Sequence, residues 1–170
     1  LHPFMNLFFR QQYALADATV GLLVAGLSLA LGFGGMFGRP VAQALGPRRG
    51  LVVLLGLAAV TGAGTLIPQP WVAYACYALS TFLIGIAFPF FDLLLIASVA
   101  PQQRGLTKSV ASMQWSIGWA TAAFISGQLQ VQYGFWLPIV IFACGQGIAA
   151  FVAWHLPYRD QRTLPVAVGA

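Results

Sequence analysis

Five long apolar stretches dominate this chain of 170 residues, at residues 19–37, 51–67, 71–99, 107–127 and 135–156. A helix that crosses a lipid bilayer needs about 20 mainly apolar residues, because each residue advances the helix by about 1.5 Å. Pro68 and Pro70 end the second stretch and the third stops before Pro101, since proline cannot continue a helix. The pattern predicts an all-α, polytopic transmembrane helix bundle over residues 1–157, followed by a tail at 158–170.

The composition also indicates that lipid, not water, surrounds most of the chain. Hydrophobic residues make up 59% of it and charged residues only 6%, whereas a soluble domain carries about 25% charged residues. The formal net charge of +5 does not favour a nucleic-acid partner, because the cations lie singly or in pairs and form no basic face. Anionic lipid headgroups explain this charge, so the expected partner is the lipid bilayer.

Lysine and arginine lie beside alternate apolar stretches. Arg39, Arg48 and Arg49 follow the first stretch, Arg104 and Lys108 the third, and Arg159 and Arg162 the fifth. Cations beside membrane spans are retained in the cytoplasm during insertion. We therefore expect a multi-pass protein of the cell membrane whose first stretch is entered from outside and whose C-terminus is cytoplasmic. Arg10 is the exception, and Asp17 beside it is placed to cap the first helix.

Three motifs lie in the gaps between the stretches. They are GRPVAQALGPRR at 38–49, PQQRG at 101–105 followed by Ser109, and SGQL at 126–129 followed by YGF at 133–135 and Pro138. Their order, spacing and sidedness resemble the C-terminal half of major facilitator superfamily transporters. There they correspond to the loop between helices eight and nine, the loop before helix eleven, and the turn between helices eleven and twelve. Gln43 and Ala44 stand where the family's fuller pattern has an Asp-Arg pair.

The resemblance implies that the five stretches are helices eight to twelve and that residues 1–9 are the outer end of helix seven. Transporters of this family contain two six-helix halves around a central cavity. The resemblance therefore implies secondary active transport of an unidentified small solute by alternating access, with proton coupling as the expected energy source. It also implies a missing N-terminal half as the necessary partner.

Asp92 is the one acidic residue inside an apolar stretch. A carboxylate near the middle of a transmembrane helix costs about 2.5–3.5 kcal/mol on insertion scales, which favours a functional role. Thr81, Phe88 and Asp92 share one helical face, so we expect this face to line a water-filled path in which Asp92 accepts a proton or a cationic group. The alternative is a structural aspartate that bonds to a neighbouring helix or reaches water near the inner interface.

The stretch at 107–127 offers further candidates for a solute path. Gln114 and Thr121 share a face that would bind a polar substrate. Gln114 bonded to another helix is the alternative. Trp119 lies one turn from Trp115, and such rings stack on a solute ring or a cation, or else face lipid or a neighbouring helix.

Five cations near the expected cytoplasmic ends of the stretches are candidates for fixing topology and for a gate: Arg39, Arg48, Arg49, Arg104 and Lys108. The resemblance implies that they pair with acids across a cytoplasmic gate. His2 and His155 lie at opposite ends of the sequence, and it contains no metal-ligand spacing, phosphate-binding loop or nucleophile–base pair. We therefore expect neither enzymatic activity nor a bound metal or cofactor.

Two other interpretations stay open. The chain begins with Leu1 in an incomplete helix, which would fit an inactive truncated fragment. A stripe of small residues on 107–127 would let helices pack closely, and would fit a membrane scaffold or a homo-oligomer without transport activity. The stripe consists of Ser109, Ser112, Ser116, Ala120, Ala123 and Gly127.

Overall fold

The computed structural model describes residues 4–97 and 99–155, and the regular elements within these ranges are helices. They are α1 (Met5–Tyr13), α2 (Asp17–Met36), α3 (Gly38–Leu45), α4 (Pro47–Gly64), α5 (Pro70–Ala97), a 3₁₀ turn (Pro101–Gln103), α6 (Arg104–Tyr133) and α7 (Trp136–His155). The predicted all-α fold class is confirmed. The predicted tail, and the end of the fifth stretch at residue 156, lie outside the described residues.

Among the described helices, three are long and apolar enough to cross a membrane: α2, α5 up to Ile96, and α7. α3 and α4 meet the same criterion only together, as a pair bent by 114°. α6 has 30 residues, but its serines and glutamines leave it less apolar than these. Five spans at the proposed positions therefore stay a prediction. α6 also begins before the stretch at 107–127 and continues past it.

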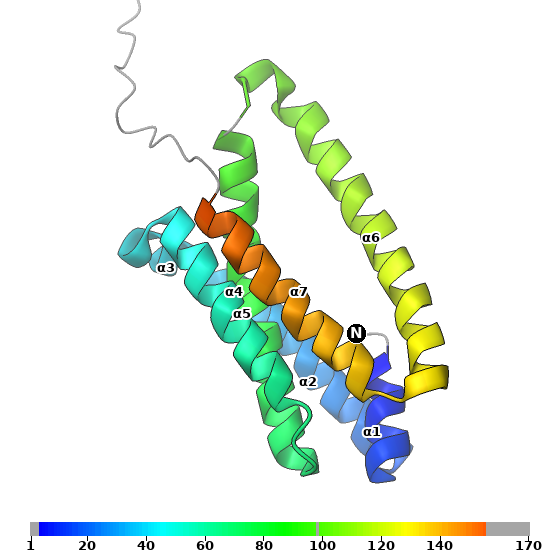
Figure 1. Cartoon of the computed structure of the whole chain (residues 1–170). Coiled ribbons are helices and arrows are strands. Elements are labelled where there is room, and N and C mark those ends of the chain that lie inside the picture. The colour runs from blue at the N-terminus through cyan, green and yellow to red at the C-terminus, as the bar shows by residue number, and fades with distance from the viewer. Residues whose placement is uncertain (1–3, 98, 156–170) are drawn as a thin grey trace, which may run out of the picture.

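α2, α4, α5 and α7 form the core of the bundle (Figure 1). α4 packs along both α5 and α7, and α2 packs along α5. One apolar cluster lies near α1 and includes the buried Phe9 and Ile139. A second cluster lies toward α3 and includes Phe90 and Ala153. The two clusters thus hold the bundle together near its opposite ends.

α2 and α5 approach each other closely because glycines face one another. A Cβ atom added to Gly34 would collide with the carbonyl oxygen of Phe82, and one added to Gly85 would collide with that of Leu31. Nearer α3, a Cβ atom on Gly38 would lie 2.7 Å from Cγ of Pro89. Small residues permit such backbone contact where lipid removes the hydrophobic drive for helix association.

α6 stands apart from the core over much of its length (Figure 1), and none of its residues is buried. Within the described part of the chain, the small-residue stripe therefore does not pack closely over most of the helix, and its packing against a second copy stays a prediction. Ser109 and Ser116 donate hydrogen bonds to carbonyl oxygens of α6 itself. At the α1 end, Gly127 lies beside the ring of Phe4. Farther along α6, the ring of Trp115 contacts the ring of Phe88 on α5.

An ion pair joins α1 to the start of α2. Nε of Arg10 lies 3.3 Å from Oδ1 of Asp17, the first residue of α2. No side chain caps this helix at Ala16, the preceding residue. The prediction that Asp17 caps the helix is therefore wrong, because its carboxylate pairs with the nearby guanidinium instead. α1 and this pair lie at the end of the molecule away from α3 (Figure 1), so the charge of Arg10 is neutralised there.

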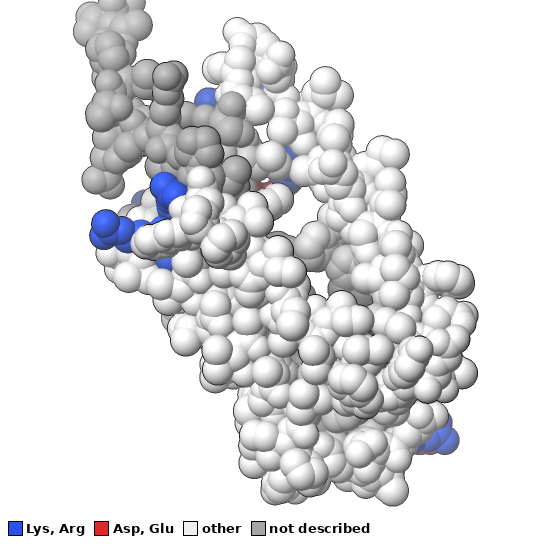
Figure 2. Space-filling model, in the orientation of Figure 1, with Lys and Arg blue, Asp and Glu red and all other residues white. Residues whose placement is uncertain are grey.

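α3 is a short amphipathic helix between α2 and α4. Its inner face carries Val41 and Ala42, which pack against the cluster around Phe90. Gly46 follows with a φ of 76°, a conformation that favours glycine, and allows the sharp bend into α4. α3 thereby lies across the end of the bundle where most of the described cations gather (Figure 2).

Candidate functional site

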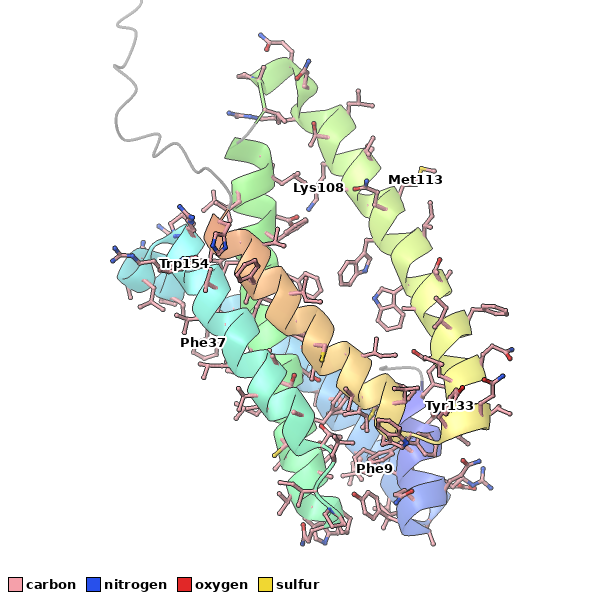
Figure 3. All side chains as sticks on the ribbon, in the orientation of Figure 1. Phe9, Phe37, Lys108, Met113, Tyr133 and Trp154 are labelled. Atoms are coloured by element: carbon pink, nitrogen blue, oxygen red, sulfur yellow. The ribbon has the colours of Figure 1, made fainter. Side chains whose placement is uncertain are left out.

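Asp92 in α5 and Lys108 in α6 form an ion pair between two helices. Nζ of Lys108 lies 2.5 Å from Oδ1 of Asp92, and each side chain is about half exposed. Figure 3 shows Lys108 directed from α6 toward α5. The acid predicted to line a solute path therefore has an intramolecular cation as its partner.

An aromatic contact lies beside this ion pair. Phe88 is one helical turn before Asp92, and its ring meets that of Trp115 edge to face, with 4.9 Å between the ring centroids and 76° between the planes. Lys108 and Trp115 are seven residues apart, so they lie on the same side of α6. The two contacts join α5 and α6 where the helices are otherwise sparsely packed, and they place a carboxylate next to aromatic rings.

The structure does not bring every predicted residue to this place. Thr81 lies on α5, buried, and its hydroxyl donates a hydrogen bond to the carbonyl oxygen of Tyr77 (2.9 Å). Trp119 is exposed one turn beyond Trp115. Gln114 is also exposed on α6, and its side chain makes no hydrogen bond with another described residue.

Thr121 lies instead in an open groove between α6 and α7. The groove has a volume of about 410 Å³. Small and apolar side chains dominate its lining, which includes Gly118, Thr121, Ser126, Leu129, Pro138 and Ile141. The hydroxyl groups of Thr121 and Ser126 are its side-chain hydrogen-bonding groups.

The predicted gate cations occupy different environments. Arg48 is engaged within the chain, where its guanidinium donates to the carbonyl oxygens of Ala153 (3.2 Å) and Trp154 near the end of α7 (Figure 3). Arg39 and Arg49 are exposed around α3, and Arg104 is exposed at the start of α6. Lys108 is the member of this group that pairs with an acid among the described residues.

The pairing of Asp92 with Lys108 was missed by sequence reasoning, although a signal for it exists. Asp92 lies eight residues before Ala100 and Lys108 eight residues after it. In two antiparallel helices joined by a short turn, residues equally distant from the turn lie at the same height. Phe88 and Trp115 do not follow the rule, since they lie twelve residues before Ala100 and fifteen residues after it. The symmetry of the hairpin could therefore have predicted the ion pair, but not the ring contact.

Comparison with known proteins identifies the family. The family model described as Major Facilitator Superfamily matches residues 1–168. The multidrug resistance protein MdtH of Cronobacter sakazakii is 32% identical over 166 residues, which cover 91% of this chain and 39% of that protein. MdtH of Klebsiella pneumoniae is 30% identical over 177 residues (98% and 42%), and MdtH of Yersinia pestis is 31% identical over 169 residues (92% and 40%).

The chain thus spans about two fifths of the length of the curated relatives that it matches. The family match, the apolar helices and the all-α fold agree with the resemblance seen in the sequence motifs. The chain is a multi-pass membrane protein and belongs to the major facilitator superfamily of transporters.

Proposed function

We propose that this chain is the C-terminal part of a secondary active transporter that moves a small solute across the cell membrane by alternating access. The family match and the coverage of about two fifths of each relative support a longer transporter. An N-terminal half would complete the central cavity, since the family builds its substrate path between two halves. The observation that carries the proposal is the ion pair of Asp92 with Lys108 on two loosely packed helices.

The chemistry of this pair suits a site that exchanges cations. Asp92 lies one helical turn from Phe88, whose ring contacts that of Trp115. A carboxylate near aromatic rings favours a proton or an organic cation over an anionic solute. In the described state the ammonium group of Lys108 occupies the carboxylate. A proton or cationic solute that binds Asp92 replaces this ammonium group and breaks the bridge between α5 and α6. Binding of a proton or cationic solute at Asp92 thereby frees α6 to move relative to α5.

The proposal includes an orientation of the chain in the membrane. The end that carries α3 and the start of α6 holds Arg39, Arg49 and Arg104, all exposed. Cations at span ends remain in the cytoplasm. We therefore place this end, together with the C-terminus, on the cytoplasmic side.

The relatives suggest which solutes to test first. Their printed name is multidrug resistance protein, so structurally varied drugs form the first panel. The experiment uses the complete reading frame that contains this chain, reconstituted in proteoliposomes. Uptake and efflux of cationic and neutral drugs are measured with and without a pH gradient.

Asp92→Asn is the test variant and Asp17→Asn is its matched control, because both aspartates form ion pairs between helices. We expect Asp92→Asn to abolish most of the flux and its dependence on the pH gradient, while Asp17→Asn retains both. The chain alone is expected to show no flux, because it lacks the partner half. Unchanged flux and pH dependence in Asp92→Asn would exclude the coupling role. If neither the full protein nor its variants moved any drug of the panel, transport of these drugs would be excluded.

A further inference from the structure

We infer that α3 and the adjoining Arg49 form a docking surface for anionic phospholipid headgroups of the leaflet at this end of the bundle. The inference does not depend on which solute is transported or on whether Asp92 couples to protons. It rests on the shape and charge of the segment from Met36 to Arg49.

α3 has the geometry of a helix that lies along the membrane surface. It is bent by 114° from α4, so it crosses the end of the bundle instead of continuing a span. Gly38, Val41, Ala42 and Leu45 recur at helical spacing on one face. Val41 and Ala42 pack on the core, which leaves Arg39 and Gln43 exposed on the opposite face. A short helix of this kind belongs at the boundary between headgroups and acyl chains.

Exposed apolar side chains flank the same surface. Met36 is 72% exposed, Phe37 49% and Leu45 44%. In water these side chains would be costly to leave uncovered, but at a membrane boundary they contact acyl chains. Figure 3 shows Phe37 at the rim of the bundle beside α3. The mixture of exposed apolar and cationic groups fits a lipid surface better than a soluble anionic partner.

Arg39 and Arg49 give this surface the positive charge that attracts anionic headgroups. Arg39 and Arg49 are exposed, and their side chains have no hydrogen-bond or ion-pair partner among the described residues. Arg48 between them is different, because the end of α7 already occupies its guanidinium. Two free guanidinium groups at the level of the headgroups match lipid phosphates, since guanidinium binds phosphate oxygens in a bidentate manner. Near an anionic membrane, each such cation is expected to contribute about a fivefold preference for the anionic lipid.

The test measures lipid preference beside α3 in vesicles. A fluorophore is attached to Leu45→Cys after Cys76 and Cys144 are replaced by alanine. Its quenching by nitroxide-labelled phosphatidylglycerol is compared with quenching by phosphatidylcholine that carries the same label. We expect phosphatidylglycerol to quench severalfold more strongly at equal mole fraction. Equal quenching by the two lipids would overturn the proposal.

The variants assign the preference to the two arginines. Arg39→Gln with Arg49→Gln should bring the two lipids close to parity, and the corresponding double lysine variant should restore most of the preference. Arg104→Gln removes an exposed cation at the start of α6 and should change little. An equal loss in Arg104→Gln would mean that overall charge, and not this surface, attracts the lipid.

Two further arms distinguish other sources of the signal. A fluorophore on Gln12→Cys, near the neutral Arg10–Asp17 pair, should show no preference for phosphatidylglycerol. Inorganic phosphate, added at matched ionic strength, should leave the preference beside α3 unchanged. If phosphate abolishes it, the surface binds soluble phosphate and the assignment to lipid is wrong.

Discussion

Arg48 at the start of α4 binds the last turn of α7: Nε of Arg48 lies 3.2 Å from the carbonyl oxygen of Ala153. The same guanidinium also donates to the carbonyl oxygen of Trp154. The last carbonyl groups of a helix have no partner within the helix and carry partial negative charge. One arginine therefore satisfies two such groups and joins α4 to α7, with Arg48 and Ala153 lying 105 positions apart in the sequence.

Replacing this arginine should loosen the end of α7. Because hydrogen bonds to charged groups contribute about 1.5–3 kcal/mol when buried and this one is only partly buried, we expect Arg48→Gln to lower the free energy of unfolding by about 1–2 kcal/mol. Hydrogen exchange of the amides in the last turns of α7 should also become faster. Arg49→Gln is the control, since Arg49 is exposed and should change neither quantity. Equal effects of the two substitutions would contradict the anchoring role.

A methyl group at Gly34 should destabilise the contact between α2 and α5. The atom it would strike is the backbone carbonyl oxygen of Phe82, which cannot rotate away. Overpacking of this kind costs about 1–3 kcal/mol, and we expect Gly34→Ala to lower thermal stability in detergent accordingly.

Gly32 provides the matched control within the same helix. A Cβ atom there would have no atom within 4 Å apart from its local helix. Because alanine favours a helix over glycine by about 0.8–1.0 kcal/mol, Gly32→Ala should be neutral or stabilising. A comparable loss of stability in both variants would show that helix packing at Gly34 is not the cause.

The parts of this fold that follow from local chemistry could be predicted from the sequence. Pro68, Pro70 and Pro101 mark helix boundaries because proline cannot donate the required hydrogen bond. The ends of α4 and α5 accordingly lie within a few residues of the predicted positions. The length and apolar character of the stretches likewise predicted an all-α membrane bundle.

The parts that depend on distant neighbours could not be predicted in the same way. The small residues on α6 permit close packing, but the sequence does not say whether a partner helix reaches them. Asp17 could cap its helix or pair with Arg10, and the second interaction occurs because α1 brings the guanidinium within reach. The pairing of Asp92 with Lys108 is an exception, because their equal distance from Ala100 in the sequence indicates that they lie opposite each other.

The contact between Phe88 and Trp115 should be measurable as a coupling energy. Edge-to-face aromatic pairs contribute about 0.5–1.5 kcal/mol beyond the area that they bury. A double-mutant cycle with Phe88→Leu and Trp115→Leu should give a coupling within this range in the free energy of unfolding. The same cycle with Phe88→Leu and Trp136→Leu should be additive, because Trp136 begins α7 and has no described contact with Phe88. Additivity in both cycles would mean that the ring contact does not hold α6 to α5.

The orientation of the chain in the membrane can be tested by labelling single cysteines from each side. Arg49 and Arg104 lie in different gaps between the apolar stretches but at the same end of the molecule, whereas Gln132 lies near the opposite end of α6. Single cysteines at these positions, in a background without Cys76 and Cys144, can be labelled in intact cells with a reagent that does not cross the membrane. We expect labelling of Gln132→Cys from outside, and labelling of Arg49→Cys and Arg104→Cys only after the membrane is permeabilised, because cations beside spans stay in the cytoplasm. Labelling of Arg49→Cys and Arg104→Cys from opposite sides would require an odd number of crossings between them, and would exclude the proposed arrangement in which α4 and α5 each cross once.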